Sequence, residues 1–120
     1  MKEIHLPHDH GTNTSSLAAN MPPQDTFDRT AATFNLLSDP SRVKILLLLC
    51  HTEDCVLNIA AAAEMSSPAV SHHLKVLKQA GVLTSRKSGK EVYYTLADTE
   101  MAQLVHVIVD TIFDLNCKER

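Results

Sequence analysis

The chain has 120 residues, an apolar fraction of 44% and a net charge of −3. This length allows one domain with a single core, and no apolar run approaches the ~20 residues that a membrane-spanning helix requires. The first residues also lack the apolar segment of a signal peptide. We therefore expect a cytoplasmic protein with no membrane partner, whose three cysteines are reduced thiols, metal ligands or redox switches.

The first 23 residues differ in composition from the rest of the chain. They are polar, they include His5, His8 and His10, and they show neither the period of a strand nor that of a helix. We interpret residues 1–23 as a flexible, histidine-containing arm and residues 24–120 as one folded domain.

Two helices are predicted at the start of this domain. The first runs from about residue 25 to residue 37, because its apolar residues recur at helical spacing. The second is expected over residues 40–50, where Asp39 is a favourable N-cap and Pro40 suits the first helical position. Its apolar composition indicates that this second helix is the buried centre of the fold.

Residues 56–80 have the size and pattern of a helix–turn–helix. A short helix is predicted over residues 56–63. The second helix begins after a serine cap, either Ser66 or Ser67, and it ends before Gly81, which can adopt the left-handed conformation of a helix C-terminus.

This second helix is expected to have two different faces. Val70, Leu74 and Leu77 recur at helical spacing and should point into the core. The opposite face carries small or long side chains that can form hydrogen bonds, as contacts in a DNA groove require. The expected DNA contacts on this helix are Ser67, Ser71, His72 and Lys75.

After residue 81 the pattern changes to that of a β-hairpin. Residues 82–87 and 90–96 predict two strands around a tight turn. Between residues 65 and 90 there are five basic residues and no acidic one, although the whole chain is acidic. Such segregation is typical of a surface that binds a polyanion. We expect phosphate or minor-groove contacts from the basic residues at the hairpin tip, which are Arg86, Lys87 and Lys90.

A last helix is predicted from about Thr99 to Leu115, with Asp98 as its N-cap. A terminal helix that is apolar on more than one face needs a second surface to cover it, so we expect a homodimer through symmetry-related copies of this helix. The predicted fold is mostly α with a small β-hairpin (α+β), in the order α-α-α-α-β-β-α. The apolar stripe expected on the last helix consists of Met101, Val105, Ile108, Ile112 and Leu115.

Three sequence blocks resemble the ArsR–SmtB family of winged-helix repressors. They are FNLLSDPSRVKIL at residues 34–46, SPAVSHHLKVL at residues 67–77, and GVL followed by RKSGKEVYY within residues 81–94. The resemblance covers about residues 27–115. It implies a winged helix-turn-helix homodimer that binds a palindromic operator in double-stranded DNA and is released when a metal ion or a thiol oxidant binds.

The family places sensor sites at several positions, and the first is only partly present here. This site uses a cysteine motif before the third helix, of which residues 53–57 keep one cysteine and lack the second. The end of the second helix offers another thiolate, and the arm offers imidazoles. Such ligands suit zinc or another thiophilic metal ion as effector. The alternative is that the thiol is part of the core and the histidines belong to a disordered tail. The candidate ligands are Cys50, Cys55, His8 and His10.

A second family site lies on the last helix and is also incomplete. Its pattern is Asp-x-His, ten residues, and then His, whereas this chain lacks both imidazoles and has Thr111 in place of the second. His106 and Asp110, four residues apart, offer only an off-register substitute, and Asp98 could serve merely as a cap. The candidates on this helix are Asp98, Glu100, His106, Asp110 and Asp114.

Thiol chemistry is the third sensor hypothesis. Some relatives use one cysteine in the second helix and one in the last helix as a switch for persulfide or oxidant, and Cys50 with Cys117 lie in those elements, displaced by about one turn. Arsenite is compatible with Cys50 and Cys55.

A different class of function is a winged-helix protein-interaction module without DNA binding. An enzyme is not expected, because no nucleophile–base–orienter set is suggested by the spacing.

Overall fold

The computed structural model describes residues 4–114. The chain divides into two compact units, Met1–Ala32 and Thr33–Arg120. No helix among residues 4–114 is long and apolar enough to cross a membrane. The elements are α1 (Thr14–Ala19), α2 (Gln24–Leu36), α3 (Pro40–Leu49), β1 (Asp54–Cys55), α4 (Val56–Ala63), α5 (Ser67–Gln79), β2 (Leu83–Ser88), β3 (Glu91–Leu96) and α6 (Glu100–Ile112).

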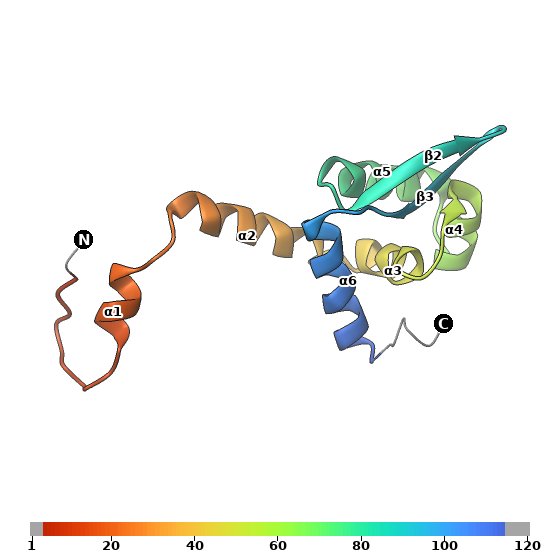
Figure 1. Cartoon of the computed structure of the whole chain (residues 1–120). Helices are drawn as coiled ribbons and strands as arrows, with labels where there is room; N and C mark the ends of the chain where they lie inside the picture. Colours follow the sequence, from red (N-terminus) through yellow and green to blue (C-terminus); the bar gives the residue numbers. More distant parts are fainter. Residues whose placement is uncertain (1–3, 115–120) are drawn as a thin grey trace. The chain divides into compact units, whose positions relative to one another are not determined.

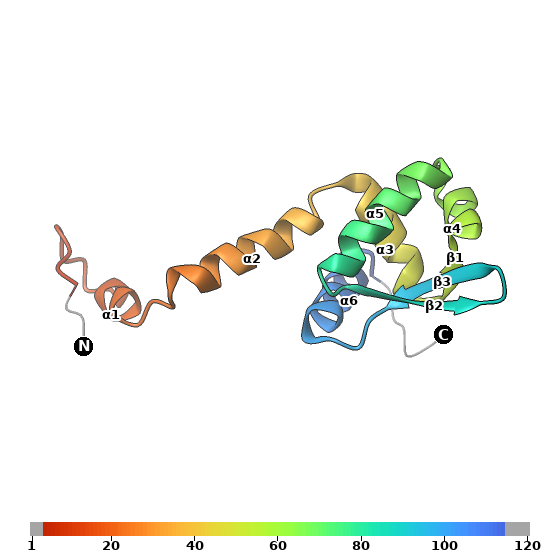
Figure 2. The same ribbon diagram turned by 90° about the horizontal axis from the view of Figure 1, so that it is seen from above.

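The second unit is a winged helix-turn-helix in which β2 and β3 form a hairpin that projects beyond the helices (Figures 1 and 2). The predicted order of helices and hairpin strands is confirmed. The structure adds α1, within the segment expected to be an arm, and β1, which pairs antiparallel with β3 so that the sheet order is β1-β3-β2. Because β1 has only two residues, it is too short to show an alternating pattern in the sequence.

The helix ends follow from local hydrogen bonds. The Asp39 carboxylate accepts from the backbone N–H groups of Ser41 and Arg42 at 2.8 and 3.1 Å, and Ser66 Oγ accepts from the N–H of Ala69 at 3.3 Å. Gly81 has a φ of +81°, the left-handed conformation that glycine adopts without a steric penalty. These three sequence predictions are confirmed.

The N-terminus of α6 differs from the prediction. Thr99, not Asp98, is the N-cap: its Oγ1 accepts from the backbone N–H of Ala102 at 3.0 Å. The same hydroxyl donates to the carbonyl of Gly81 at 2.7 Å. The prediction of an Asp98 cap is therefore wrong, because the threonine makes a second hydrogen bond to a distant segment.

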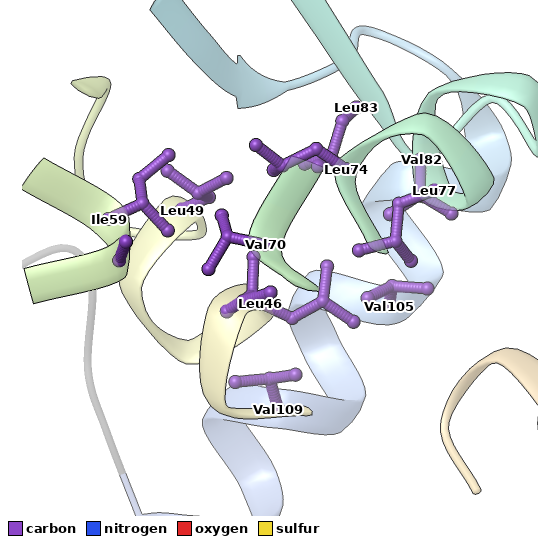
Figure 3. Close-up of a cluster of buried hydrophobic side chains, with 12 residues drawn as sticks. Leu46, Leu49, Ile59, Val70, Leu74, Leu77, Val82, Leu83, Val105 and Val109 are labelled. Carbon is purple, nitrogen blue, oxygen red and sulfur yellow. The ribbon is translucent and has the colours of Figure 1, made fainter. Parts of the chain in front are cut away.

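The core lies between α3, α4, α5 and α6, and Val82 and Leu83 at the start of the hairpin complete it (Figure 3). As predicted, Val70, Leu74 and Leu77 of α5 have no exposed surface. Val105 and Val109 of α6 belong to the same cluster as Leu46 of α3. Burial of each large aliphatic side chain stabilises the fold by roughly 1.5–3 kcal/mol. This cluster fixes how α3, α5 and α6 are placed relative to one another.

The apolar stripe predicted for α6 is only partly correct. The buried residues of this helix are Ala102, Val105 and Val109. Of the predicted stripe, Val105 is buried and Ile112 is 70% exposed, and Leu115 lies outside the described residues. The sequence did not distinguish the two apolar faces of α6, because both contain large aliphatic residues at helical spacing.

Candidate DNA interface and metal centre

Helix α5 presents a polar face on the side opposite the core. Ser71, His72 and Lys75 are exposed and Ser67 is half-buried. Ser67, Ser71 and Lys75 are each four residues apart and therefore lie along one face of the helix. A row of hydroxyl and ammonium groups on an exposed helix can donate to phosphate oxygens and to base edges in a major groove.

The hairpin places two further cations beside its turn. The pairing of Ser88 with Glu91 leaves Gly89 and Lys90 as the turn residues, and Gly89 has a φ of +64°. Lys87 and Lys90 are exposed next to this turn. An exposed basic tip on a two-stranded ribbon is suited to contact with DNA phosphates.

Arg86 occupies a different environment from the two lysines. Its guanidinium is paired with the Glu53 carboxylate at 2.6 Å and lies 5.0 Å from the centre of the Tyr93 ring. Hydrogen bonds from Arg86 hold the pKa of Glu53 below its usual value. In this structure the cation predicted to contact DNA is therefore engaged by an acidic side chain.

The candidate thiols are placed in the second unit. Cys55 is 7% exposed, and a hydrogen bond to the Glu91 carboxylate raises the pKa of its thiol. Cys50 is half-buried at the C-cap of α3. Cys117 lies outside the described residues.

The candidate histidines of the arm are placed in the first unit. The rings of His8 and His10 are stacked with their centres 5.7 Å apart. The joint thiolate and imidazole site with Cys50 and Cys55 stays a prediction from the sequence.

The candidates on α6 separate into two groups. Asp98, Glu100 and Asp114 are exposed, whereas His106 and Asp110 are half-buried. The Nε2 atom of His106 lies 3.2 Å from Asp110 Oδ2. His106 and Asp110 are thus the pair on this helix that the fold brings together.

His51, which follows α3, lies beside this pair as a third potential ligand. Its Nε2 atom lies 2.9 Å from Asp110 Oδ1, and its Nδ1 atom lies 2.8 Å from the carbonyl oxygen of Leu47. Across residues 4–114, the one group of three or more potential metal ligands is His51, His106 and Asp110, with ligand atoms within 4.8 Å of one another. We call these three residues the α3–α6 cluster.

His51 was not expected from the sequence to be part of a site. His51 lies in a polar break between two predicted helices, 59 positions before Asp110, so its spacing to the last helix carries no signal. The only clue was the i, i+4 pair of His106 and Asp110. The partner of this pair is decided by the packing of α3 against α6.

Comparison with known proteins places this architecture among bacterial regulators. A family profile for the bacterial regulatory proteins of the arsR family matches residues 39–85. The HTH-type transcriptional repressor SmtB of Mycobacterium tuberculosis is 38% identical over 76% of this chain and 65% of its own length. A homolog of the cadmium resistance transcriptional regulatory protein CadC from Staphylococcus aureus is 46% identical over 62% of this chain and 63% of its own.

A solved structure shares the fold over most of its length. It is the homodimeric winged helix-turn-helix DNA-binding domain of a Mycobacterium bovis protein, which is 31% identical with a TM-score of 0.65 over 76% of this chain and 83% of that domain. The chain spans slightly less than two thirds of the length of the SmtB and CadC relatives. The profile match, the identities and the shared architecture show that the chain belongs to the arsR family of bacterial regulatory proteins.

Proposed function

We propose that the chain is a homodimeric transcriptional repressor that binds a palindromic operator and is released from it by a metal ion. The observation that carries the proposal is the exposed face of α5, with Ser71, His72 and Lys75, together with the basic hairpin tip at Lys87 and Lys90. These groups suit simultaneous contact with a major groove and its flanking phosphates. A repressor acts on the chromosome, so we place the protein in the cytoplasm and assign it no enzymatic role.

The outer face of α6 supports the homodimer. Leu104, Val107 and Ile112 are 51%, 62% and 70% exposed, and several large apolar residues on one exposed helix indicate a surface that is covered by a partner. A second copy of α6 would cover it symmetrically. Such a dimer presents two copies of α5, as a palindromic site requires.

The metal effector is supported by family and by side-chain chemistry. The CadC relative is named for cadmium resistance, and the α3–α6 cluster gathers three potential ligands. The alternative is a thiol switch responding to oxidant or persulfide. The buried Cys55 thiol has a raised pKa, which disfavours the reactive thiolate, while the pairing of Cys50 with Cys117 stays a prediction.

DNA binding can be tested with a fragment upstream of the protein's own gene that contains an inverted repeat. We expect affinity to fall with salt, and each of Lys75→Ala, Lys87→Ala and Lys90→Ala to reduce the slope of log K against log [salt] by about 0.9. Arg29→Ala, an exposed cation paired with Asp25 on α2, serves as the control. Binding that is absent, or that does not respond to salt, would contradict the proposal and favour a protein-interaction module.

The effector can be tested on the same complex. Zinc, cadmium, arsenite, persulfide and peroxide are added to the protein and to its Cys50→Ser, Cys55→Ser and Cys117→Ser variants. We expect a metal ion to release the operator from all four proteins. Release by persulfide or peroxide that is lost in a cysteine variant would support the thiol switch instead.

A further inference from the structure

We propose that His51, His106 and Asp110 bind one divalent ion of the zinc class within a single protomer, and that this ion controls the orientation of α6. The regulatory half of this inference rests on the proposed repressor function. Metal binding itself does not, because all three ligands belong to one chain and none of them is among the proposed DNA contacts on α5 and the hairpin.

The three side chains are already close to the arrangement of a metal site. His106 and Asp110 are one turn apart on α6, and His51 reaches the same carboxylate from the end of α3. Bonds of ~2.0–2.2 Å around a tetrahedral zinc ion place ligand atoms about 3.4 Å apart. Because the ligand atoms of the cluster lie within 4.8 Å of one another, small side-chain rotations suffice to bring them to that spacing.

The hydrogen bond between His51 and Leu47 determines which nitrogen of the His51 ring faces Asp110 without a hydrogen. A carbonyl oxygen only accepts, so the Nδ1 atom of His51 carries the hydrogen and donates it to Leu47 O at 2.8 Å. The neutral ring then directs the lone pair of Nε2 at Asp110 Oδ1, which is also an acceptor, only 2.9 Å away. This contact is favourable only when a cation, either a proton or a metal ion, lies between the two atoms.

The same hydrogen bond is the second feature expected of a metal ligand. Histidines that bind metal ions usually donate their other ring N–H to a carbonyl or a carboxylate, which fixes the ring and its tautomer. His51 has this partner within its own helical turn. The ring is thus held with Nε2 facing the cluster before any ion binds.

Burial and ligand type indicate the class of ion. The side chains of His51, Asp110 and His106 are 14%, 20% and 30% exposed, so solvent reaches the cluster while the charges are partly shielded from water. Two imidazole nitrogens and one carboxylate oxygen suit zinc, cobalt or nickel, whereas arsenite and other very soft species prefer thiolates. Water can complete the coordination.

The location of the cluster connects it to the DNA-binding face. On one side, α6 packs through Val105 and Val109 into the core that α3 and α5 share (Figure 3). On the other side it presents the apolar surface that we propose as the dimer interface. An ion that ties the end of α3 to α6 restrains the angle of α6, and therefore the separation of the two α5 helices in the dimer.

Metal binding should be measured first without DNA. Apo-protein of full length is titrated with Co(II), whose absorption spectrum reports its ligands, and with Zn(II) by calorimetry. We expect one ion per protomer, with affinity reduced at least tenfold by Asp110→Asn and by His106→Gln. Asp28→Asn, which removes a carboxylate on α2, is the matched control, and circular dichroism of each apo-variant checks the fold.

Operator affinity with and without Zn(II) tests the regulatory half. A change of about 5–150-fold, typical of an allosteric effector, is expected for the wild type and not for Asp110→Asn. Wild-type protein that binds no metal, or Asp110→Asn that binds as tightly as wild type, would overturn the site. Metal binding that is lost in Cys50→Ser and retained in Asp110→Asn would also overturn it in favour of a thiolate site. Failure of all operator binding would reject the repressor function and leave the DNA-free titration to decide the site.

Discussion

Helices α5 and α6 are built alike and differ mainly on their outer faces. Each has 13 residues, each begins at a hydroxyl side chain that caps the third residue after it, and each buries three apolar residues. Outside the core, α5 carries Ser71, His72 and Lys75, whereas α6 carries Leu104 and Val107.

This difference separates what specifies the fold from what specifies function. The two buried stripes hold both helices against α3 in the same way, so burial alone does not distinguish them. The polar face of α5 fits a nucleic acid and the apolar face of α6 fits a copy of itself. The flank of α6 also carries two potential metal ligands, His106 and Asp110, at the edge of the stripe that contacts α3.

The largest expected effect comes from making the outer face of α6 polar. Leu104→Glu combined with Val107→Glu places two charges in the proposed dimer interface, so we expect monomers and a loss of operator affinity of about 10²–10⁴-fold as the second half-site contact is lost. Analytical ultracentrifugation and DNA-binding titrations measure the two effects. Gln24→Glu, which adds a charge at an exposed position on α2 and outside α6, should change neither. A double variant that remains dimeric would show that this face has another role.

The buried stripes of α5 and α6 should contribute differently to the free energy of unfolding. Leu74→Ala removes a side chain with no exposed surface from the middle of α5, and we expect it to lower the free energy of unfolding by about 2–5 kcal/mol. Val109→Ala, which removes fewer atoms from α6, should cost less. Urea unfolding of the two variants measures the comparison. An equal loss would mean that α6 is packed more tightly than its smaller side chains indicate.

The caps of α5 and α6 should differ in how much they stabilise the protein. Ser66→Ala removes one hydrogen bond to the first turn of α5, so we expect a loss of about 1 kcal/mol. Thr99→Ala removes the cap of α6 and also the bond to the Gly81 carbonyl, so we expect a larger loss. Thermal unfolding followed by circular dichroism measures both. If the two losses are equal, the Gly81 bond adds nothing to stability.

The smallest effect is expected where Glu53 holds Arg86. Glu53→Gln weakens this exposed ion pair and releases a cation beside the hairpin, so we expect operator affinity to rise by about twofold to fivefold. Arg86 lowers the pKa of Glu53 from its usual value of 4.5. The ion pair therefore stabilises the fold above that value, and this contribution is lost as the pH falls through the lower pKa of the folded state.

Unfolding of the wild type and of Glu53→Gln across acidic pH tests the predicted pH dependence of stability. We expect the wild type to be the more stable of the two at neutral pH and the difference to shrink in acid. A difference that grows as the pH falls would contradict the sign of the pKa shift.

The parts of the site that could be predicted are those encoded within single elements. The outer face of α5 and the lysines of the hairpin follow from helical spacing and from the absence of acidic residues between residues 65 and 90. His106 and Asp110 were recognised as a pair for the same reason. Their partner His51 was missed because it lies 59 positions from Asp110. The ion pair between Arg86 and Glu53 was missed because these residues are 33 positions apart.

The sequence by itself therefore determined the helices from residue 24 onward, the cap at Asp39, a serine cap at either Ser66 or Ser67, the buried stripe of α5 and the basic surface beside it. These features depend on neighbours within one or two turns, where spacing and propensity are sufficient. Only the tertiary structure decided which face of α6 is buried, that Thr99 rather than Asp98 caps it, and that the end of α3 meets it at a cluster of two imidazoles and a carboxylate. The physical reason is that such contacts form when separate helices pack, and no local pattern records which side chains then meet.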